Sequence, residues 1–297
     1  MRLWTAGIVL LGALSQAQAE EYSKSYSVSG RAAVHVHVDD SRVRVVTSDA
    51  QQVDFNVRRK GTSGLSLGKA LKINSHQDGD HVEISVLHEP GIAIGFTEHH
   101  LMTEVHMPRD ADLQIETRDG RVDLASMNGN VTVHSTDGAI TASQLTGKIE
   151  LQSVDGAINA DTFKGDVRLH STDGSITVTH FDGQCDVSST DGALRAEGRF
   201  DALRLVTTDG SVVAKVAEGS RMTSGWTIRT VDGSLEVSLP QDLQANINAS
   251  TQDGRIHLGV PVTVQGEISK SRVRGTLNGG GPELTLKSTD GAIKISN

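Results

Sequence analysis

Apolar and polar residues alternate along most of the chain, in runs too short to form amphipathic helices. Val34 to Val38 reads V-H-V-H-V, and Arg42 to Val45 reads R-V-R-V. Alternation with a period of two places the apolar side chains on one face of a strand, so these runs predict half-buried β-strands. No window carries a long apolar stripe at helical spacing. The pattern therefore predicts an all-β protein.

The central part of the chain repeats one short pattern every 18 residues. Asp-Gly pairs mark one point of this repeat, at Asp119, Asp137, Asp155, Asp173, Asp191 and Asp209. Glycines mark a second point halfway between them, at Gly129, Gly147, Gly165 and Gly183. Each glycine opens a G-x-Φ-x-Φ unit, in which Φ is an apolar residue. The unit of nine residues is thus used twice in each repeat.

A short, fixed period with strand patterning is typical of a β-solenoid. We predict a parallel β-solenoid whose 18-residue coils each contribute two short strands, with neighbouring coils about 4.8 Å apart. Large apolar residues recur at the same step, at Met127, Leu145, Phe163 and Phe181, and at the next coil the match slips by one residue to Phe200. We expect this column to fill one interior corner of every coil.

The Asp-Gly pairs are interpreted as turns. Glycine supplies a positive φ, and an aspartate oxygen can accept a hydrogen bond from a nearby backbone N–H. A turn is needed on every coil, whereas catalysis needs one or two special positions. We therefore assign no catalytic, cofactor-binding or metal-binding residue and expect no cofactor.

Two other interpretations of the aspartates remain open. A ladder of stacked carboxylates repels itself, and Ca²⁺ could relieve that repulsion; however, the G-G-x-G-x-D-x-U-x pattern of calcium-binding β-rolls is absent. Paired aspartates also hydrolyse polysaccharides on some β-helices. That chemistry needs an acid and a base in different environments, and the repeat singles out no one aspartate.

The regular repeat covers only part of the chain. After Asp209 the next Asp-Gly pairs follow at steps of 23 and 21 residues, and the last is Asp290-Gly291. Insertions at 217–226 and 239–246 predict bulged corners, after which the chain returns to the strand pattern. The segment 20–110 is strand-rich outside the 18-residue register, with strands expected near residues 34–38, 43–46, 53–57, 71–73 and 82–86.

The first residues predict export. Arg2, the apolar run Leu3 to Leu14 and the small-x-small site Ala17-Gln18-Ala19 form a signal-peptide pattern. The expected organisation is a signal peptide at 1–19, an N-terminal β cap with irregular coils at 20–110 and a β-solenoid repeat region at 111–297. The mature chain has no further segment long enough to span a membrane.

The net charge limits the expected partners, and the cysteine content limits the cross-links that could stabilise the fold. Loss of Arg2 changes the formal charge from −9 to −10, and an acidic surface repels phosphate backbones, so nucleic acid is not an expected partner. The single cysteine, Cys185, cannot form an internal disulfide. It occupies an apolar position of the repeat, so we expect a buried, inert thiol.

Other candidate motifs have structural explanations. The G-L-S-L-G run at Gly64 to Gly68 matches a nucleophile elbow only formally, because no helix is expected after it. The glycines at 279–281 lack the lysine of a phosphate loop and predict a turn.

Of the twelve histidines, eight precede Met107. His35 and His37 share one strand face, and His99-His100 is expected in a loop; solvent-facing strand positions explain these residues better than a metal site does.

His134 and His170 are expected on outward positions two coils apart. At about 9.6 Å, twice the strand spacing, they are too distant to share one metal ion.

The segment "VHMPRDADLQIETRDGRVDLASMNGNVTVHSTDG" resembles a widespread bacterial family of exported domains of unknown function that are labelled "putative adhesin". The residues that match the family pattern are Val105, Pro108, Ala111, Leu113, Ile115, Thr117 and Gly120, and the ending "GTLNGGGPELTLKSTDGAIKI" also matches. The resemblance extends over residues 34–295. It implies a repeat fold and an adhesin-like role, and it supplies no catalytic residues.

These observations together predict a non-enzymatic, exported β-solenoid, periplasmic or extracellular. It would act as an adhesin or bind an envelope component, a glycan or a peptide. A polysaccharide-active β-helix enzyme is one alternative. An envelope stress or antimicrobial-peptide sensor is another, because acidic ladders attract cationic peptides.

Overall fold

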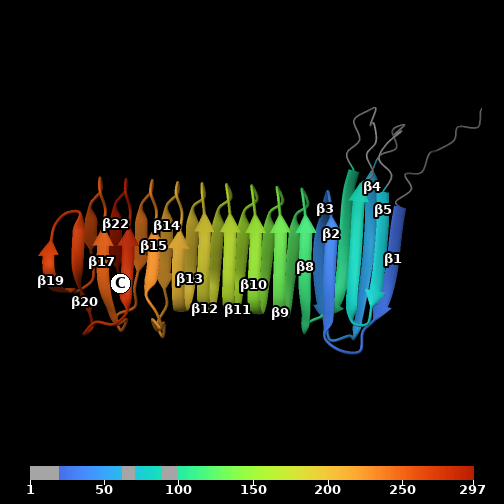
Figure 1. Cartoon of the computed structure of the whole chain (residues 1–297), viewed down its shortest axis with the longest axis horizontal. Coiled ribbons are helices and arrows are strands. Elements are labelled where there is room, and N and C mark those ends of the chain that lie inside the picture. Colours follow the sequence, from blue (N-terminus) through green and yellow to red (C-terminus); the bar gives the residue numbers. More distant parts are fainter. Residues whose placement is uncertain (1–19, 62–70, 89–98) are drawn as a thin grey trace, which may run out of the picture.

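The structure, a computed structural model, describes residues 20–61, 71–88 and 99–297. These residues form a long stack of strands with the N-terminal strands at one end and the C-terminal strands towards the other (Figure 1). The described chain is all-β and contains no helix. The predicted β-solenoid class is therefore confirmed. The signal-peptide pattern and the G-L-S-L-G run lie outside the described residues.

Four long strands form the regular centre of the stack: β9 (Val122–Ser135), β10 (Ile140–Ser153), β11 (Ile158–Ser171) and β12 (Ile176–Ser189). They pair in parallel with an 18-residue offset, so that Ile140 lies beside Ile158 and Ile149 beside Val167. Each strand bends near its middle at a non-glycine residue with a φ of 51–61°, namely Ser126, Gln144, Thr162 and His180. Each coil therefore contributes two short straight segments, as the repeat predicts.

The bend divides the stack into two faces. Face A contains the second halves of the long strands and face B contains their first halves. At the N-terminal end face A continues through β8, β2, β6 and β5, and face B through β3, β7, β4 and β1. Alternate residues of both faces point into the space between them, because successive side chains of a strand point to opposite sides.

The interior is filled by ladders of equivalent residues. Met127, Leu145, Phe163 and Phe181 are all at most 2% exposed, so the predicted corner column is confirmed. Between β12 and β13 (Leu194–Val206) the register shifts, and Gly183 lies beside Phe200. Phe200 still reaches the column and stacks on Phe181 with ring centroids 5.4 Å apart. Burial of each such side chain contributes roughly 1.5–3 kcal/mol.

Cys185 lies on the inner side of face A and is buried. Burial raises the pKa of its thiol, which suppresses the reactive thiolate. We expect the native protein to resist a bulky thiol reagent and the urea-unfolded protein to be labelled fully. Rapid labelling of the native protein, followed by mass spectrometry, would contradict this placement.

The glycine of each Asp-Gly pair has a different role from the one predicted. Within the repeat, the positive φ angles fall on the mid-repeat glycines, such as Gly147 (φ 131°) and Gly165 (φ 125°), and not on the glycines that follow the acidic corner residues. A Cβ on Gly156 would instead lie 2.2 Å from the carbonyl oxygen of Gly138 in the preceding coil. Close approach of successive coils, and not left-handed backbone, therefore requires glycine at this corner.

The C-terminal strands do not stack in the order of the sequence. They are β14 (Val212–Val216), β15 (Trp226–Arg229), β16 (Leu235–Ser238), β17 (Ala245–Ser250), β18 (Ile256–Leu258), β19 (Thr263–Ile268), β20 (Arg272–Leu277), β21 (Glu283–Lys287) and β22 (Ile293–Ser296). β21 pairs with both β15 and β17, and β22 pairs with both β16 and β18. The last coil of the chain is thus inserted between two earlier coils, and the C-terminus lies inside the stack (Figure 1).

Antiparallel strands close the N-terminal end. The strands are β1 (Glu20–Ser27), β2 (Ala32–Val38), β3 (Ser41–Ser48), β4 (Gln52–Gly61), β5 (Leu71–Asp78), β6 (His81–His88), β7 (His99–Pro108) and β8 (Ala111–Thr117). β1 pairs antiparallel with β4, and β5 with β6, at the outer ends of the two faces. All five strands predicted in this segment are present. One prediction is wrong: His99 and His100 belong to strand β7 and not to a loop, because their backbone pairs with that of β4.

Candidate functional site

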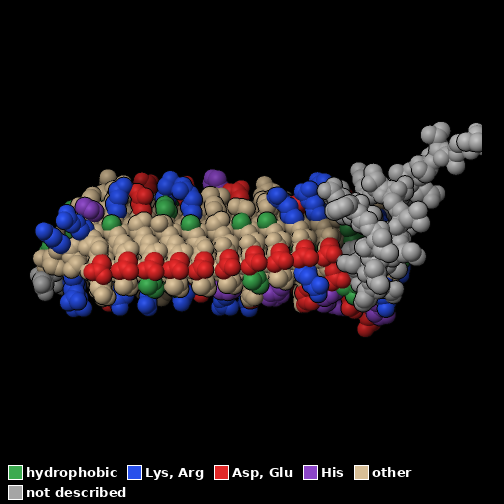
Figure 2. Space-filling view, turned by 90° about the horizontal axis from the view of Figure 1, so that it is seen from above, with side chains coloured by type: hydrophobic (Ala, Val, Ile, Leu, Met, Phe, Trp, Pro, Cys, Tyr) green, Lys and Arg blue, Asp and Glu red, His purple; other side chains and the backbone are tan. Residues whose placement is uncertain are grey.

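A row of exposed aspartates is the most regular feature of the surface. It lies at the corner where face A turns into face B, and Figure 2 shows it as a continuous red line along the stack. Backbone contacts between corners give its order, since Asp290 lies between the corners of Asp232 and Asp253. We call this set the acidic row; its members are Asp119, Asp137, Asp155, Asp173, Asp191, Asp209, Asp232, Asp290 and Asp253.

A hydroxyl ladder, and not the aspartates, holds these corners together. The Oγ of Ser153 accepts a hydrogen bond from the backbone N–H of Gly156 at 2.9 Å, and the Oγ of Ser171 in the next coil donates to the carbonyl oxygen of Gly156 at 3.2 Å. Within the described chain, no carboxylate of the acidic row accepts a hydrogen bond from a backbone N–H. The predicted aspartate acceptor is therefore wrong, because a buried serine or threonine two residues earlier takes that role and leaves the carboxylate in solvent.

Two carboxyl groups of the acidic row have raised pKa values. A shared hydrogen bond with Asp40 is the largest cause that raises the pKa of Asp119 to about 6, and partial burial and Asp137 add to it. The pKa of Asp155 is also raised, first by desolvation and then by the charges of Asp137 and Asp173. Competition of two carboxylates for one proton explains the raised pKa of Asp119, and loss of solvent followed by like-charge repulsion explains that of Asp155.

This perturbation predicts a pH-dependent stability. A carboxyl with a raised pKa binds more protons in the folded state than in the unfolded state between about pH 4 and pH 6, so its contribution falls as the pH rises through that window. We expect Asp119→Asn to raise the melting temperature at pH 7.5 and to give a smaller gain at pH 4.5. Thermal unfolding at both pH values measures this, and an equal shift at both would contradict the assigned pKa.

The described residues contain no group of three or more histidine, cysteine or acidic side chains placed to hold a metal ion. His37 Nδ1 lies 3.1 Å from one oxygen of Glu116, and His35 Nε2 lies 3.6 Å from the other. His170 Nδ1 lies 3.0 Å from the Ser188 hydroxyl. These histidines occupy outer strand positions beside polar neighbours, which agrees with their interpretation as strand-face residues.

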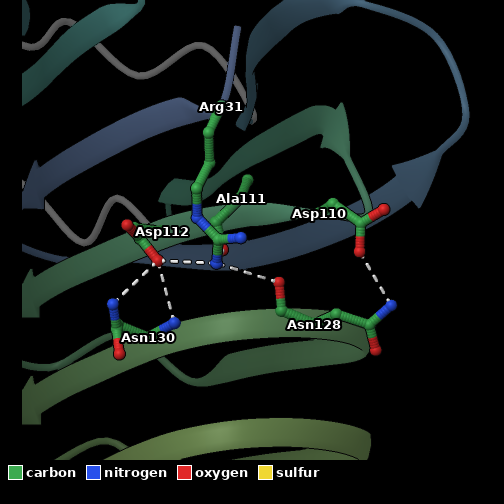
Figure 3. Close-up of polar contacts among 6 residues, drawn as sticks. All are labelled: Arg31, Asp110, Ala111, Asp112, Asn128 and Asn130. Atoms are coloured by element: carbon green, nitrogen blue, oxygen red, sulfur yellow. Dashed lines mark hydrogen bonds and ion pairs between the residues drawn. The ribbon is translucent and has the colours of Figure 1, made fainter.

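A polar cluster joins the cap to the first regular coil (Figure 3). Arg31 donates to Asp112 at 2.9 Å, and Asp112 also accepts a bond from the backbone N–H of Asn130 at 2.9 Å. The Arg31 guanidinium also donates to the carbonyl oxygen of Asn128. The hydrogen bond and charge of Arg31, together with the hydrogen bonds from Asn130, hold the pKa of Asp112 below its usual range. This cluster fixes β2, β8 and β9 in register and is satisfied internally, so it serves the fold.

A second surface was not found by sequence reasoning. Three cations, Arg229, Lys287 and Arg272, line one hollow of about 350 Å³ on the outer side of face A near the C-terminal end. They lie up to 58 residues apart in the sequence, on three different strands. Only the insertion of the last coil brings them together, so no local motif marks them.

Within the described residues, no helix is long and apolar enough to cross a membrane.

Comparison with known proteins gives a family match and two similar solved structures. A family model described as Toastrack DUF4097 matches residues 32–296. A "putative cell adhesion protein" from Clostridium sporogenes ATCC 15579 is similar at 11% identity and a TM-score of 0.27, over 94% of this chain and 99% of that chain. A "putative adhesin" from Bacteroides fragilis NCTC 9343 is similar at 12% identity and a TM-score of 0.40, over 94% and 97%. No curated protein matches the chain.

Proposed function

The chain belongs to the Toastrack DUF4097 family, and we propose that it is a non-enzymatic, exported β-solenoid that binds a partner in the cell envelope or at the cell surface, as an adhesin does. The predicted resemblance to a family of domains of unknown function is confirmed by the match to residues 32–296. The proposed role rests on the outer surface of the stack, and the proposed export rests on the signal-peptide pattern.

The observation that carries this proposal is the periodic outer surface of the solenoid. Equivalent outward positions lie side by side in successive coils; Glu150, Arg168 and Asp186 are one example on face A. The coils repeat about every 4.8 Å, so each face presents polar groups in straight rows over many coils. Such a surface suits an extended partner that makes many similar contacts, since several weak contacts on one chain add up to a stable complex.

Three hollows among the described residues support binding over hydrolysis. A glycoside hydrolase uses two carboxyl groups in unlike environments on either side of the bond that is cleaved. The hollow around Arg229 is lined by no carboxylate. Glu283 is the one carboxylate among the residues that line a hollow at Asn246, and Asp123 is the one carboxylate in a hollow at Arg44. Asp123 is moreover paired with Arg42 at 2.7 Å and with Arg121 at 2.8 Å.

A binding screen with glycans and peptides tests the proposed function, if each bound glycan is also incubated with the protein and assayed for new reducing ends. We expect saturable binding of at least one envelope glycan or peptide without release of fragments. Time-dependent depolymerisation that an aspartate-to-asparagine variant abolishes would establish the enzyme instead. Cell fractionation tests export, for which we expect a mature chain that starts at Glu20.

The acidic row favours a sensor of cationic peptides as a second candidate function. Its nine exposed carboxylates attract positive charge along the stack, and this attraction should weaken with salt. In the same screen, this candidate is supported if cationic peptides bind more tightly than any glycan. It is excluded if a peptide of the same length and no net charge binds equally well.

A further inference from the structure

Four cations cluster on the outer side of face A near the C-terminal end. Arg229 of β15 lies beside Lys287 of β21, Lys287 lies beside Ser250 of β17, and Ser250 lies beside Arg272 of β20. With strands about 4.8 Å apart, three of the four cations lie at one level across four strands. Arg274 follows on β20 and points to the same side, since Val273 between them is buried.

Among the described residues, several cations on the outer faces are paired with carboxylates, and three of the four clustered cations are not. On the same face, Arg204 pairs with Asp186 at 3.4 Å, and on face B Lys294 pairs with Glu236 at 2.7 Å. Within the described chain, Arg229, Lys287 and Arg272 make no ion pair. The charge of Arg274 adds to the hydrogen bonds from Asn248 and Thr285 that lower the pKa of Glu283. Neighbouring like charges on adjacent strands destabilise a sheet, and a local conflict of this kind in a regular fold is typical of a functional site.

The hollow also carries hydrogen-bonding groups that the fold does not use. The side chains of Ser250, Thr289 and Gln252 line it together with the cations, and none has a hydrogen-bond partner within the described chain. By contrast, the Thr251 hydroxyl already donates to the carbonyl oxygen of Gly291 at 2.8 Å. Free donors therefore surround the three cations at the outer surface.

A second hollow continues along the same strands. It is lined by Asn246, Asn248, Arg274, Thr276 and Glu283 among others. The amide nitrogen of Asn248 donates to Glu283 at 3.1 Å, which leaves the Asn248 carbonyl oxygen as a free acceptor. The two hollows thus place cations beside amide and hydroxyl groups along residues 246–252, which comprise most of β17 and the start of the corner after it.

Nearby carboxylates limit the direction from which an anion can approach. Asp253 and Asp290 of the acidic row directly follow Gln252 and Thr289 at the corner, and Glu283 lies at the far side of the second hollow. An anion is repelled from both of these sides. It can approach from the front of face A, where the cations are exposed.

We propose that the two hollows bind an anionic glycan, with Arg229, Lys287 and Arg272 holding its carboxylate or phosphate groups. Guanidinium groups bind both kinds of oxyanion through paired hydrogen bonds. The amide and hydroxyl groups of the second hollow bind the hydroxyls of the same chain. No aromatic residue lines either hollow, which disfavours single-stranded nucleic acid, because its bases bind by stacking on aromatic side chains.

This inference rests on the proposed binding function and names its ligand class. Titration calorimetry with the purified protein tests it, with oligogalacturonate as the carboxylated probe, inorganic phosphate as the phosphate probe and a neutral maltooligosaccharide of equal length as the reference. The test variant combines Arg229→Gln, Lys287→Gln and Arg272→Gln. The control variant combines Lys148→Gln, Lys164→Gln and Arg168→Gln. It also removes three positive charges, from exposed positions elsewhere on the stack.

We expect oligogalacturonate or phosphate to bind and the neutral chain not to bind. The test variant should bind at least about 100-fold more weakly, because each lost charge-assisted contact costs on the order of tenfold in Kd, and it should melt no lower than the parent, because it removes repulsion. The control variant should bind nearly as tightly as the parent. The tighter of the two acidic probes identifies the group that the site prefers.

Three results would overturn the inference: no binding of either acidic probe, equal loss of binding in both variants, or equal affinity for the neutral chain. If the protein binds another glycan or a peptide in the screen but neither acidic probe, this inference fails and the proposed function stands. If it binds nothing in the screen, both fail.

Discussion

Gly156→Ala is expected to destabilise the protein severely, by at least about 3 kcal/mol. The added Cβ would lie 2.2 Å from the carbonyl oxygen of Gly138, 2.6 Å from its carbonyl carbon and 2.6 Å from the hydroxyl of Ser153. Two of these atoms belong to the backbone and cannot rotate away. The corner must therefore move, which separates the coils that the hydroxyl ladder joins. Each coil is stabilised by its neighbours, so the damage spreads along the stack.

Gly79→Ala is the matched control, because it introduces the same methyl group at a position with a different constraint. Gly79 has a φ of 58° and no atom within 4 Å of the added Cβ. We expect only the cost of a left-handed alanine, about 1–2 kcal/mol. Urea unfolding of both variants measures the difference. A smaller loss for Gly156→Ala than for Gly79→Ala would show that backbone conformation, and not close approach, selects the corner glycines.

Removal of residues 283–297 is expected to unfold the C-terminal coils as a unit. This segment contains β21 and β22, and each of them lies between two other strands. Without it, β15 and β16 lose one neighbour, and β18 loses β22, the one strand with which it pairs in the part of the chain that the structure describes. Buried side chains such as Leu284 and Ile293 also leave the core. We expect amide hydrogen exchange to become fast from residue 226 onward and to stay slow in β9 to β12.

Removal of residues 20–27 is the control for this truncation. Among the described strands, β1 pairs with β4 alone, at the outer end of face B. Its loss should therefore accelerate exchange in β4 and leave the central coils protected. Slow exchange across 226–258 in the C-terminal truncation would contradict the inserted position of the last coil.

The regular coils could be predicted from sequence because their information is local. The step of 18 residues from Asp119 to Asp209 and the alternation around it predict the strands and, from β9 to β12, their register, and the structure confirms them. The role of Gly156 could not be predicted in the same way. A glycine at positive φ and a glycine at a close backbone contact look alike in a sequence, and only the distance to Gly138 separates them.

The cation cluster was missed for a different reason. The order of the coils after Asp209 depends on which strand edges pair, and that depends on packing over distances of up to about 60 residues. The corner spacing changes to 23 and then 21 residues, which removes the register signal. Lys287 can be placed beside Arg229 and Ser250 only when the insertion of β21 is known.

The central claim is that the Asp-Gly repeat serves the stacking of the coils and that its aspartates are no metal site. Thermal unfolding of the parent and of a variant with Asp137→Asn, Asp155→Asn and Asp173→Asn, each with and without Ca²⁺, tests this claim most directly. Asparagine keeps the turn preference and removes the charge, so we predict that the variant melts at the same temperature as the parent or slightly higher at pH 7.5, and that Ca²⁺ stabilises neither protein strongly. A large loss of stability in the variant, together with strong Ca²⁺ stabilisation of the parent alone, would contradict the account and establish a calcium ladder.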